Sequence, residues 1–232
     1  MKITAISDLH GLLPVIEPSD ILFICGDISP LKIQHNIPAM EEWLYNDFYN
    51  WAKEAPVNKI YLIAGNHDFY FERASDKKID EFKFKFKDFL EYLRDEVTYY
   101  YDENGKQYDI YGTPYCKMFG NWAFMRNNDY LTEKFEMIPD DIDFILSHDT
   151  PYKVGQQDLI LETVRWSNHN LEHVGNIPLR NRLEEVKYKY LFHGHIHSSL
   201  HEFEDFGTGK VVNCSLVNER YDEYYKPIIL EV

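Results

Sequence analysis

Short apolar runs that each end in a cluster of polar residues recur five times along the chain. Each run is a few residues long and rich in β-branched or large apolar residues, which is typical of a strand buried on both faces of a sheet. Because the carboxyl ends of parallel strands meet along one edge of a sheet, the polar clusters are expected to surround one crevice. The five predicted strands are residues 3–6, 21–25, 60–64, 142–146 and 190–192.

Two helices are predicted from the spacing of apolar residues. Within residues 38–55, Met40, Leu44 and Phe48 recur at helical steps, so this segment is expected to form a helix with one apolar face and to complete a β-α-β unit. The same period predicts a helix over residues 76–95, although the alternation of Phe and Lys in its middle would also suit a strand.

The remaining strands are predicted from local turns. The pair Asn104-Gly105 accepts positive φ and predicts a hairpin, because such a pair forms the tight turn between two antiparallel strands. A length of 232 residues suits one sizeable core, so one domain covering residues 1–232 is expected. The strands predicted in this part of the chain are residues 97–101, 108–111, 201–204, 210–214 and 227–231.

The polar clusters together offer the ligands of a metal centre. They supply carboxylate oxygens, an amide oxygen and imidazole nitrogens, with no thiolate, and this set suits manganese, iron or zinc better than calcium or magnesium. Seven such groups exceed the needs of one tetrahedral ion, whereas two ions that share a carboxylate would use them all. Two such ions activate water and polarise a phosphoryl group, so phosphoester hydrolysis is the expected chemistry. The candidate ligands are Asp8, His10, Asp27, Asn66, His148, His195 and His197.

Five motifs stand in a fixed order along the chain: Asp8-x-His10, Gly26-Asp27, Gly65-Asn66-His67-Asp68, His148 and Gly194-His195-Ile196-His197. A chain with these motifs resembles the calcineurin-like metallophosphoesterases. Ala64 precedes Gly65 where the protein serine/threonine phosphatases carry an arginine, so the chain looks more like the small phosphodiesterase-type members. The resemblance implies an α/β fold, a four-layer α/β/β/α sandwich of two mixed sheets with outer helices.

The resemblance also implies roles for the residues of these motifs. A hydroxide that bridges two divalent transition-metal ions would attack phosphorus, and His67 would protonate the leaving alkoxide as general acid. Asp68 would hold the ring of His67 and raise its basicity. Manganese is the expected ion, with iron, zinc and nickel as alternatives. One ion would take Asp8, His10, Asp27 and His197, and the other Asp27, Asn66, His148 and His195.

Charge and cysteine content limit the partners and the compartment. Lys and Arg number 24 against 39 Asp and Glu, and the formal net charge of −15 repels polyanions, so a small phosphoester is expected rather than nucleic acid. The three cysteines, Cys25, Cys116 and Cys214, are far apart and unpaired by spacing, which favours reduced thiols and a cytoplasmic protein. No stretch has the apolar length of a membrane span, so no membrane partner is expected.

Two other functions stay open at this point. One is a non-catalytic, metal-binding interaction scaffold of the same fold, and the other is a nuclease of that fold. A complete set of candidate ligands argues against the scaffold, and the acidic net charge argues against the nuclease. The sequence does not constrain the oligomeric state.

Overall fold

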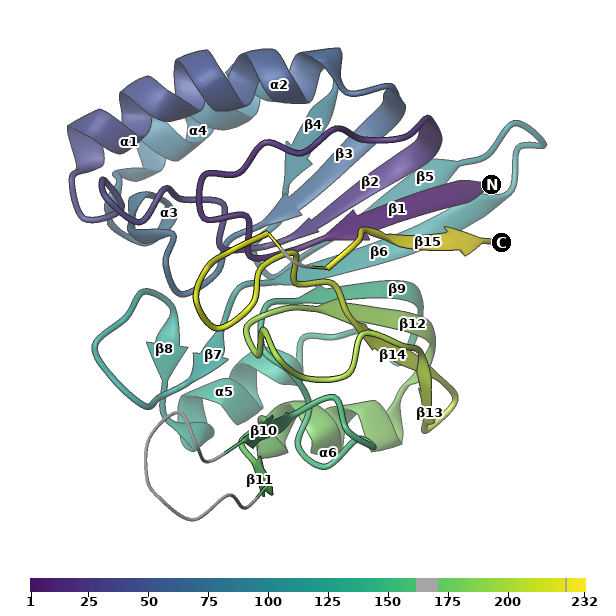
Figure 1. The fold of residues 1–232 in the computed structure, drawn as a ribbon. Helices are drawn as coiled ribbons and strands as arrows, with labels where there is room; N and C mark the ends of the chain where they lie inside the picture. Colours follow the sequence, from purple (N-terminus) through teal and green to yellow (C-terminus); the bar gives the residue numbers. More distant parts are fainter. Residues whose placement is uncertain (162–170, 224) are drawn as a thin grey trace.

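Two large β-sheets lie face to face, with helices on the outer face of each, in a computed structural model that describes residues 1–161, 171–223 and 225–232 (Figure 1). Both sheets are mixed, because each combines parallel strands with at least one antiparallel edge strand. The predicted four-layer α/β/β/α sandwich is therefore confirmed.

The first sheet is built mainly from the amino-terminal part of the chain. It contains β1 (Lys2–Ile6), β2 (Ser19–Cys25), β3 (Val57–Ile63), β4 (Leu90–Tyr92) and β15 (Ile228–Glu231). The strand order is β15-β1-β2-β3-β4, in which β1 to β4 run parallel and β15 is antiparallel to β1. The register places Ala5 beside Phe23 and Phe23 beside Tyr61.

The second sheet contains β5 (Glu96–Tyr101), β6 (Gln107–Thr113), β9 (Asp141–Ser147), β12 (Lys187–His193), β13 (Glu204–Phe206) and β14 (Gly209–Asn213). Its order is β13-β14-β12-β9-β6-β5, with antiparallel pairs at both edges and parallel strands between them. The predicted hairpin is confirmed as β5 and β6, with Gly105 at positive φ in its turn. Two small pairs complete the strands: β7 (Cys116–Lys117) with β8 (Met125–Arg126), and β10 (Leu159–Leu161) with β11 (Leu171–His173).

Helices cover both outer faces. The helix predicted over residues 38–55 is found as α1, a π-helical turn and α2 in direct succession. Together with α4 it covers the first sheet, while α5 and α6 cover the second (Figure 1). Within the described residues, no helix has the length and apolar character needed to cross a membrane. The helical segments are α1 (Ile37–Trp43), the π-helical turn (Leu44–Phe48), α2 (Tyr49–Glu54), α3 (Phe69–Arg73), α4 (Asp76–Phe86), α5 (Asn128–Phe135) and α6 (Ile177–Glu185).

Two predicted elements are wrong in extent. The helix predicted over residues 76–95 ends at Phe86, and the chain then forms β4, in which Leu90 pairs with Ile60 of β3. The helical period continues past Phe86 because Leu90 is buried in the same core that the helix faces, so periodicity could not separate the two elements. The strand predicted at residues 201–204 begins later, as β13, where it pairs with β14.

The central strands bury both of their faces. Between the sheets, the ring of Phe23 lies 6.0 Å from Tyr61, 5.6 Å from Phe144 and 5.2 Å from Phe192, measured between ring centroids. On the other face of the same strand, Leu22 packs in the core that includes Phe82 of α4. This double burial explains why the strands read as continuous apolar runs in the sequence.

Helix α4 offers a direct test of which face holds the layers together. Phe82 is fully buried against Phe71 and Phe86, whereas Phe84 is 71% exposed. Replacing Phe82 with Ala is expected to lower the free energy of unfolding by about 3–5 kcal/mol, because it removes a buried ring and leaves a cavity. The same change at Phe84 is expected to cost less than about 0.5 kcal/mol. Urea denaturation of both variants measures the difference, and equal losses would contradict this packing.

Candidate metal centre

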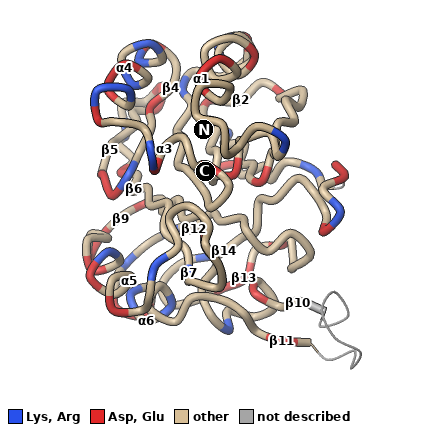
Figure 2. The backbone as a smooth tube through the Cα atoms, turned by 90° about the vertical axis from the view of Figure 1, so that its left-hand side faces the viewer, with Lys and Arg blue, Asp and Glu red and all other residues tan. Residues whose placement is uncertain are grey.

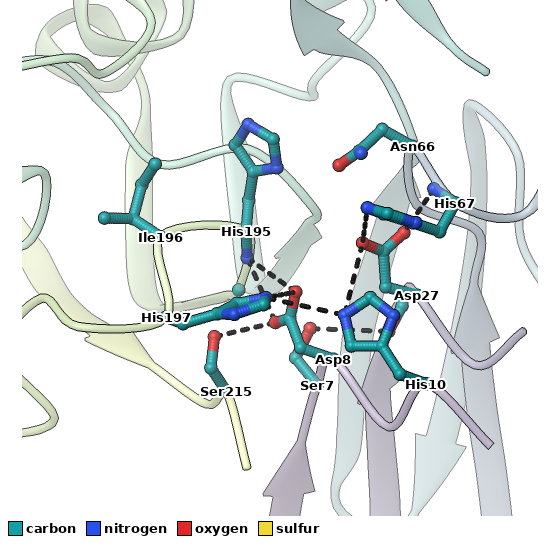
Figure 3. A network of polar contacts seen from close by, with 12 residues as sticks. Ser7, Asp8, His10, Asp27, Asn66, His67, His195, Ile196, His197 and Ser215 are labelled. Carbon is teal, nitrogen blue, oxygen red and sulfur yellow. Dashed lines mark hydrogen bonds and ion pairs between the residues drawn. The ribbon is translucent and has the colours of Figure 1, made fainter. Parts of the chain in front are cut away.

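The predicted ligands lie together where the strands of both sheets end, and Figure 3 labels all of them except His148, which lies beside Asn66 and Asp27. Each follows the carboxyl end of a strand, so five strands deliver them to one place, and the side chains of Asp8, Asp27 and His148 are almost wholly buried there. The positions are Asp8 and His10 after β1, Asp27 after β2, Asn66 after β3, His148 after β9, and His195 and His197 after β12.

Four of these residues hold a left-handed backbone. The φ angles of Asp8, His10, Asp27 and His195 are 55°, 45°, 53° and 71°, a region that residues with a Cβ rarely adopt and that collects at functional sites. The turns are tied to one another, because the Asp8 amide donates to Gly26 and the His10 amide donates to Asp27, at 3.0 and 2.9 Å. The first two loops therefore form one unit.

Two glycines allow the loops to approach the carboxylates. A Cβ at Gly65 would collide with the carboxylate of Asp27, and a Cβ at Gly194 would collide with that of Asp8. The absence of a side chain at these positions lets the backbone of one loop pack directly against the acid of another.

The first group of side chains consists of Asp8, His10 and His197. Nε2 of His197 lies 3.2 Å from Oδ1 of Asp8 and 3.4 Å from Nε2 of His10. Two ligands on one ion at about 2.1 Å stand about 3.0–3.4 Å apart when the angle between them is right or tetrahedral. The buried Nδ1 of His10 has no hydrogen-bond partner among the described residues. The spacing of these three atoms fits a shared cation.

The second group consists of Asp27, Asn66 and His148. Nε2 of His148 lies 3.0 Å from Oδ1 of Asn66 and 3.3 Å from Oδ2 of Asp27, which is again the spacing of ligands on one ion. Nδ1 of His148 contacts the carbonyl of Cys25 at 2.7 Å, so it donates there and leaves Nε2 facing the centre. Oδ2 of Asp27 is also 3.9 Å from Nε2 of His10, which places this carboxylate between the two groups.

The charges in the centre compensate one another. Burial alone would raise the pKa values of Asp8 and Asp27, but the neighbouring histidines outweigh it and hold both pKa values well below the usual range. Burial alone would lower the pKa of His148, but the charge of Asp27 and the hydrogen bond to it raise that pKa to about 10. Burial lowers the pKa of His10 to about 4. The two buried carboxylates therefore favour a positive charge beside them, either a protonated imidazole or a cation.

The contact predicted between Asp68 and the ring of His67 is not found. The buried carboxylate of Asp68 accepts hydrogen bonds from the backbone of Ser29 and Gly65 and from the Ser29 hydroxyl, at 3.0, 2.8 and 2.6 Å. Nδ1 of His67 contacts Oε1 of Gln34 at 2.6 Å instead. Asp68 therefore joins two loops, and Gln34 holds the ring that Asp68 was expected to hold.

Sequence reasoning missed three other polar contributors, of which Gln34 is one. Ser215 follows β14 and its hydroxyl donates to Oδ2 of Asp8 at 2.7 Å. The thiol of Cys116 lies near His148 and His195, where the ligand atoms of all three fall within 4.8 Å of one another. The predicted ligand set contains no cysteine, whereas the structure places this thiol beside two of the predicted histidines. Both Cys116 and Ser215 follow the end of a strand, as the predicted ligands do. Their place in the sequence could therefore have predicted that they lie at the centre.

Aromatic side chains surround the centre. The ring of Trp122 lies 4.5 Å from that of His67, and Tyr221 contacts His10 edge-on at 4.8 Å. Phe119 lies 5.6 Å from His195, and both Tyr221 and Phe119 remain about half exposed. These rings form an apolar rim around a polar centre.

The comparison with protein families agrees with this geometry. Residues 1–199 match the family described as Metallophos, calcineurin-like phosphoesterase. The chain belongs to the calcineurin-like phosphoesterases. Metallophosphoesterase domain-containing protein 1 from human and from mouse is in each case 26% identical over 255 residues, an alignment that covers 100% of this chain and 71% of the relative.

A solved structure of an archaeal phosphodiesterase is also similar to the chain. It is 15% identical, the alignment covers 99% of this chain and 100% of that one, and the TM-score is 0.40. A likeness at this level supports no functional argument. The assignment to the family rests on the match over residues 1–199.

Metal binding is expected to release protons. With a pKa of about 10, His148 carries a proton at pH 7 in the metal-free protein, and a cation that takes Nε2 must displace it. The apparent affinity should therefore rise with pH up to about pH 10. Titration calorimetry with manganese in two buffers of different ionisation enthalpy measures the release.

The control for this titration removes a histidine outside the centre. His173 pairs with Asp158 at 2.7 Å, and His173→Asn should leave the proton release unchanged. His148→Asn should reduce both the release and the affinity. A wild-type titration in which the heat does not depend on the buffer would contradict the protonated state of His148.

Proposed function

We propose that the chain is a binuclear metal-dependent phosphodiesterase that acts on a small phosphoester. The observation that carries the proposal is the pair of ligand groups on either side of Asp27, each with neighbouring ligand atoms 3.0–3.4 Å apart. Membership of the calcineurin-like phosphoesterases supports the reaction class.

We assign the ligands in two sets that share one carboxylate. When bound, two divalent cations supply an acidified water and polarise the phosphoryl oxygens, and manganese suits this mixed oxygen and nitrogen set. The carboxylate of Asp27 is fixed where both cations could share it. Its Oδ1 accepts from the His67 amide at 2.7 Å, and its Oδ2 lies near His10 of the first group and His148 of the second. The first set is Asp8, His10, Asp27 and His197, and the second is Asp27, Asn66, His148 and His195.

His67 is the proposed general acid. Its Nε2 lies 4.0 Å from Oδ2 of Asp27, at the side of the centre, while Nδ1 faces the amide oxygen of Gln34. That oxygen can only accept a hydrogen bond, so Nδ1 keeps its proton and Nε2 is the atom that gives one up. Burial lowers the pKa of His67 and the charge of Asp27 opposes this shift, so the protonated ring that acts as general acid would be stabilised by an anionic phosphoester bound beside Nε2.

The surroundings of the centre support a small substrate. The rim of Trp122, Tyr221 and Phe119 is suited to an organic ester group beside the phosphate. Basic and acidic residues are interspersed along helix α4 and around α5 and α6, the outer layers of the molecule (Figure 2). Nucleic acid binding needs a concentrated basic surface, so this distribution favours a small phosphoester over a polyanion.

Replacing Asp27 with Asn is expected to abolish turnover and leave the fold in place. The change keeps the size of the side chain but removes the charge that both ligand groups share. Hydrolysis of bis-p-nitrophenyl phosphate and of p-nitrophenyl phosphate, by metal-stripped protein reloaded with manganese, measures the effect. Asp205→Asn, at a side chain that is 84% exposed, is the matched control and should keep full activity. Full activity of Asp27→Asn, or wild-type protein that holds two ions and cleaves neither ester, would refute the proposal.

Gln34 gives a separate test of the general acid. Gln34→Leu removes the acceptor for Nδ1, so the ring of His67 loses its orientation, and kcat should fall roughly tenfold to hundredfold with little change in KM. Gln34→Glu keeps an acceptor and should retain more activity. The loss should be larger for a phenyl ester than for the p-nitrophenyl ester, because p-nitrophenolate leaves without a proton. An equal loss for both esters would contradict the assignment of His67.

A further inference from the structure

The thiol of Cys116 lies against two of the proposed ligands of the second cation. Its sulfur and one ring nitrogen from each of His148 and His195 lie within 4.8 Å of one another. Cys116 is fully buried, and His148 is too. The thiol donates to the carbonyl of Pro114 at 3.6 Å, so metal binding would exchange this hydrogen bond for a bond to a cation that the two imidazoles share.

The fold fixes Cys116 relative to His148. The Cys116 amide donates to the carbonyl of Phe124 at 3.1 Å, and the amide of Lys117 donates to Oδ2 of Asp149 at 2.7 Å. Asp149 directly follows His148 and is buried, and it also accepts from the side chain of Asn176 at 2.8 Å. One carboxylate thus ties strand β7, which begins with Cys116, to the loop that carries His148.

The orientation of His195 favours the same site. Its backbone amide donates to Oδ2 of Asp8 at 3.0 Å, while its ring is directed away from that carboxylate (Figure 3). The centroid of the ring lies 5.2 Å from that of His148 and 5.6 Å from that of Phe119. One ring nitrogen of His195 lies within 4.8 Å of the ligand atoms of His148 and Cys116.

We propose that Cys116 is a thiolate ligand of the second cation and that it makes this position select zinc over manganese. The inference rests on the binuclear centre of the proposed function. On binding, a sulfur–metal bond forms and the thiol proton leaves to solvent, with no change of oxidation state. Soft thiolate ligands favour zinc, whereas manganese favours oxygen ligands, so the two cation positions differ in their preference.

Cobalt substitution tests this ligand independently of activity. Metal-free protein is loaded with two equivalents of Co²⁺, and a thiolate-to-cobalt charge-transfer band in the near ultraviolet is expected in the wild type. Cys116→Ala should lose that band but keep the visible cobalt bands, because the imidazoles remain. Cys116→Ser keeps the size of the side chain and serves where the alanine variant is unstable.

Cys214 provides the matched control. Its thiol is also buried and also follows a strand of the second sheet, but it is absent from the ligand groups found among the described residues. Cys214→Ala should keep the charge-transfer band. In competition with a chelator, Cys116→Ser should weaken the second zinc ion by at least roughly tenfold and leave the first ion and both manganese affinities nearly unchanged.

The outcomes separate this inference from the proposed function. Wild-type protein without the band, a band that survives in Cys116→Ser, or unchanged zinc affinity in that variant would overturn the role of Cys116. A protein that shows the band, loses it in Cys116→Ser and yet cleaves no phosphoester would keep the ligand and refute the phosphodiesterase. Wild-type protein that binds neither cobalt nor manganese would overturn both.

Discussion

The burial of two carboxylates among imidazoles is the interaction on which the rest of the site depends. Asp8 and Asp27 are removed from water, and an isolated buried carboxylate is costly unless charges and donors compensate it. Here the compensation comes from the histidines, from the Ser215 hydroxyl and from the His67 and His195 amides. The neighbouring histidines keep the pKa values of both carboxylates well below the usual range, so both acids stay charged although they are buried.

The residues that compensate the buried carboxylates come from both sheets. Asp8, Asp27 and Asn66 come from the first sheet, whereas His148 and His197 come from the second. Neither sheet alone carries a full set for either group, so the distance between the sheets determines the distance between ligand atoms. The aromatic core between the sheets therefore positions the centre as well as stabilising the fold.

The sequence predicted the strands and the gathering of the candidate side chains well, because both depend on local patterns. A strand that is buried on both faces is apolar at every position, and the candidate ligands come directly after the ends of such strands. The end of α4 at Phe86 was not predictable, because the pairing of Leu90 with Ile60 is a long-range contact. Gln34 gave no signal at all, since it lies in a loop and reaches His67 only through the folded path of that loop.

The exchange between Asp68 and Gln34 shows why adjacency in sequence misled the prediction. Asp68 stands next to His67 in the chain, but its carboxylate turns to the amides of Ser29 and Gly65, where it accepts several donors that would otherwise be buried without partners. Joining the loops that carry Asp27 and Asn66 requires an acceptor with this capacity, which a carboxylate has. Orienting an imidazole requires only one acceptor, which the amide of Gln34 supplies without adding a further negative charge to a centre that already holds two buried carboxylates. The two tasks thus fall to two residues, each with the chemistry that its task requires.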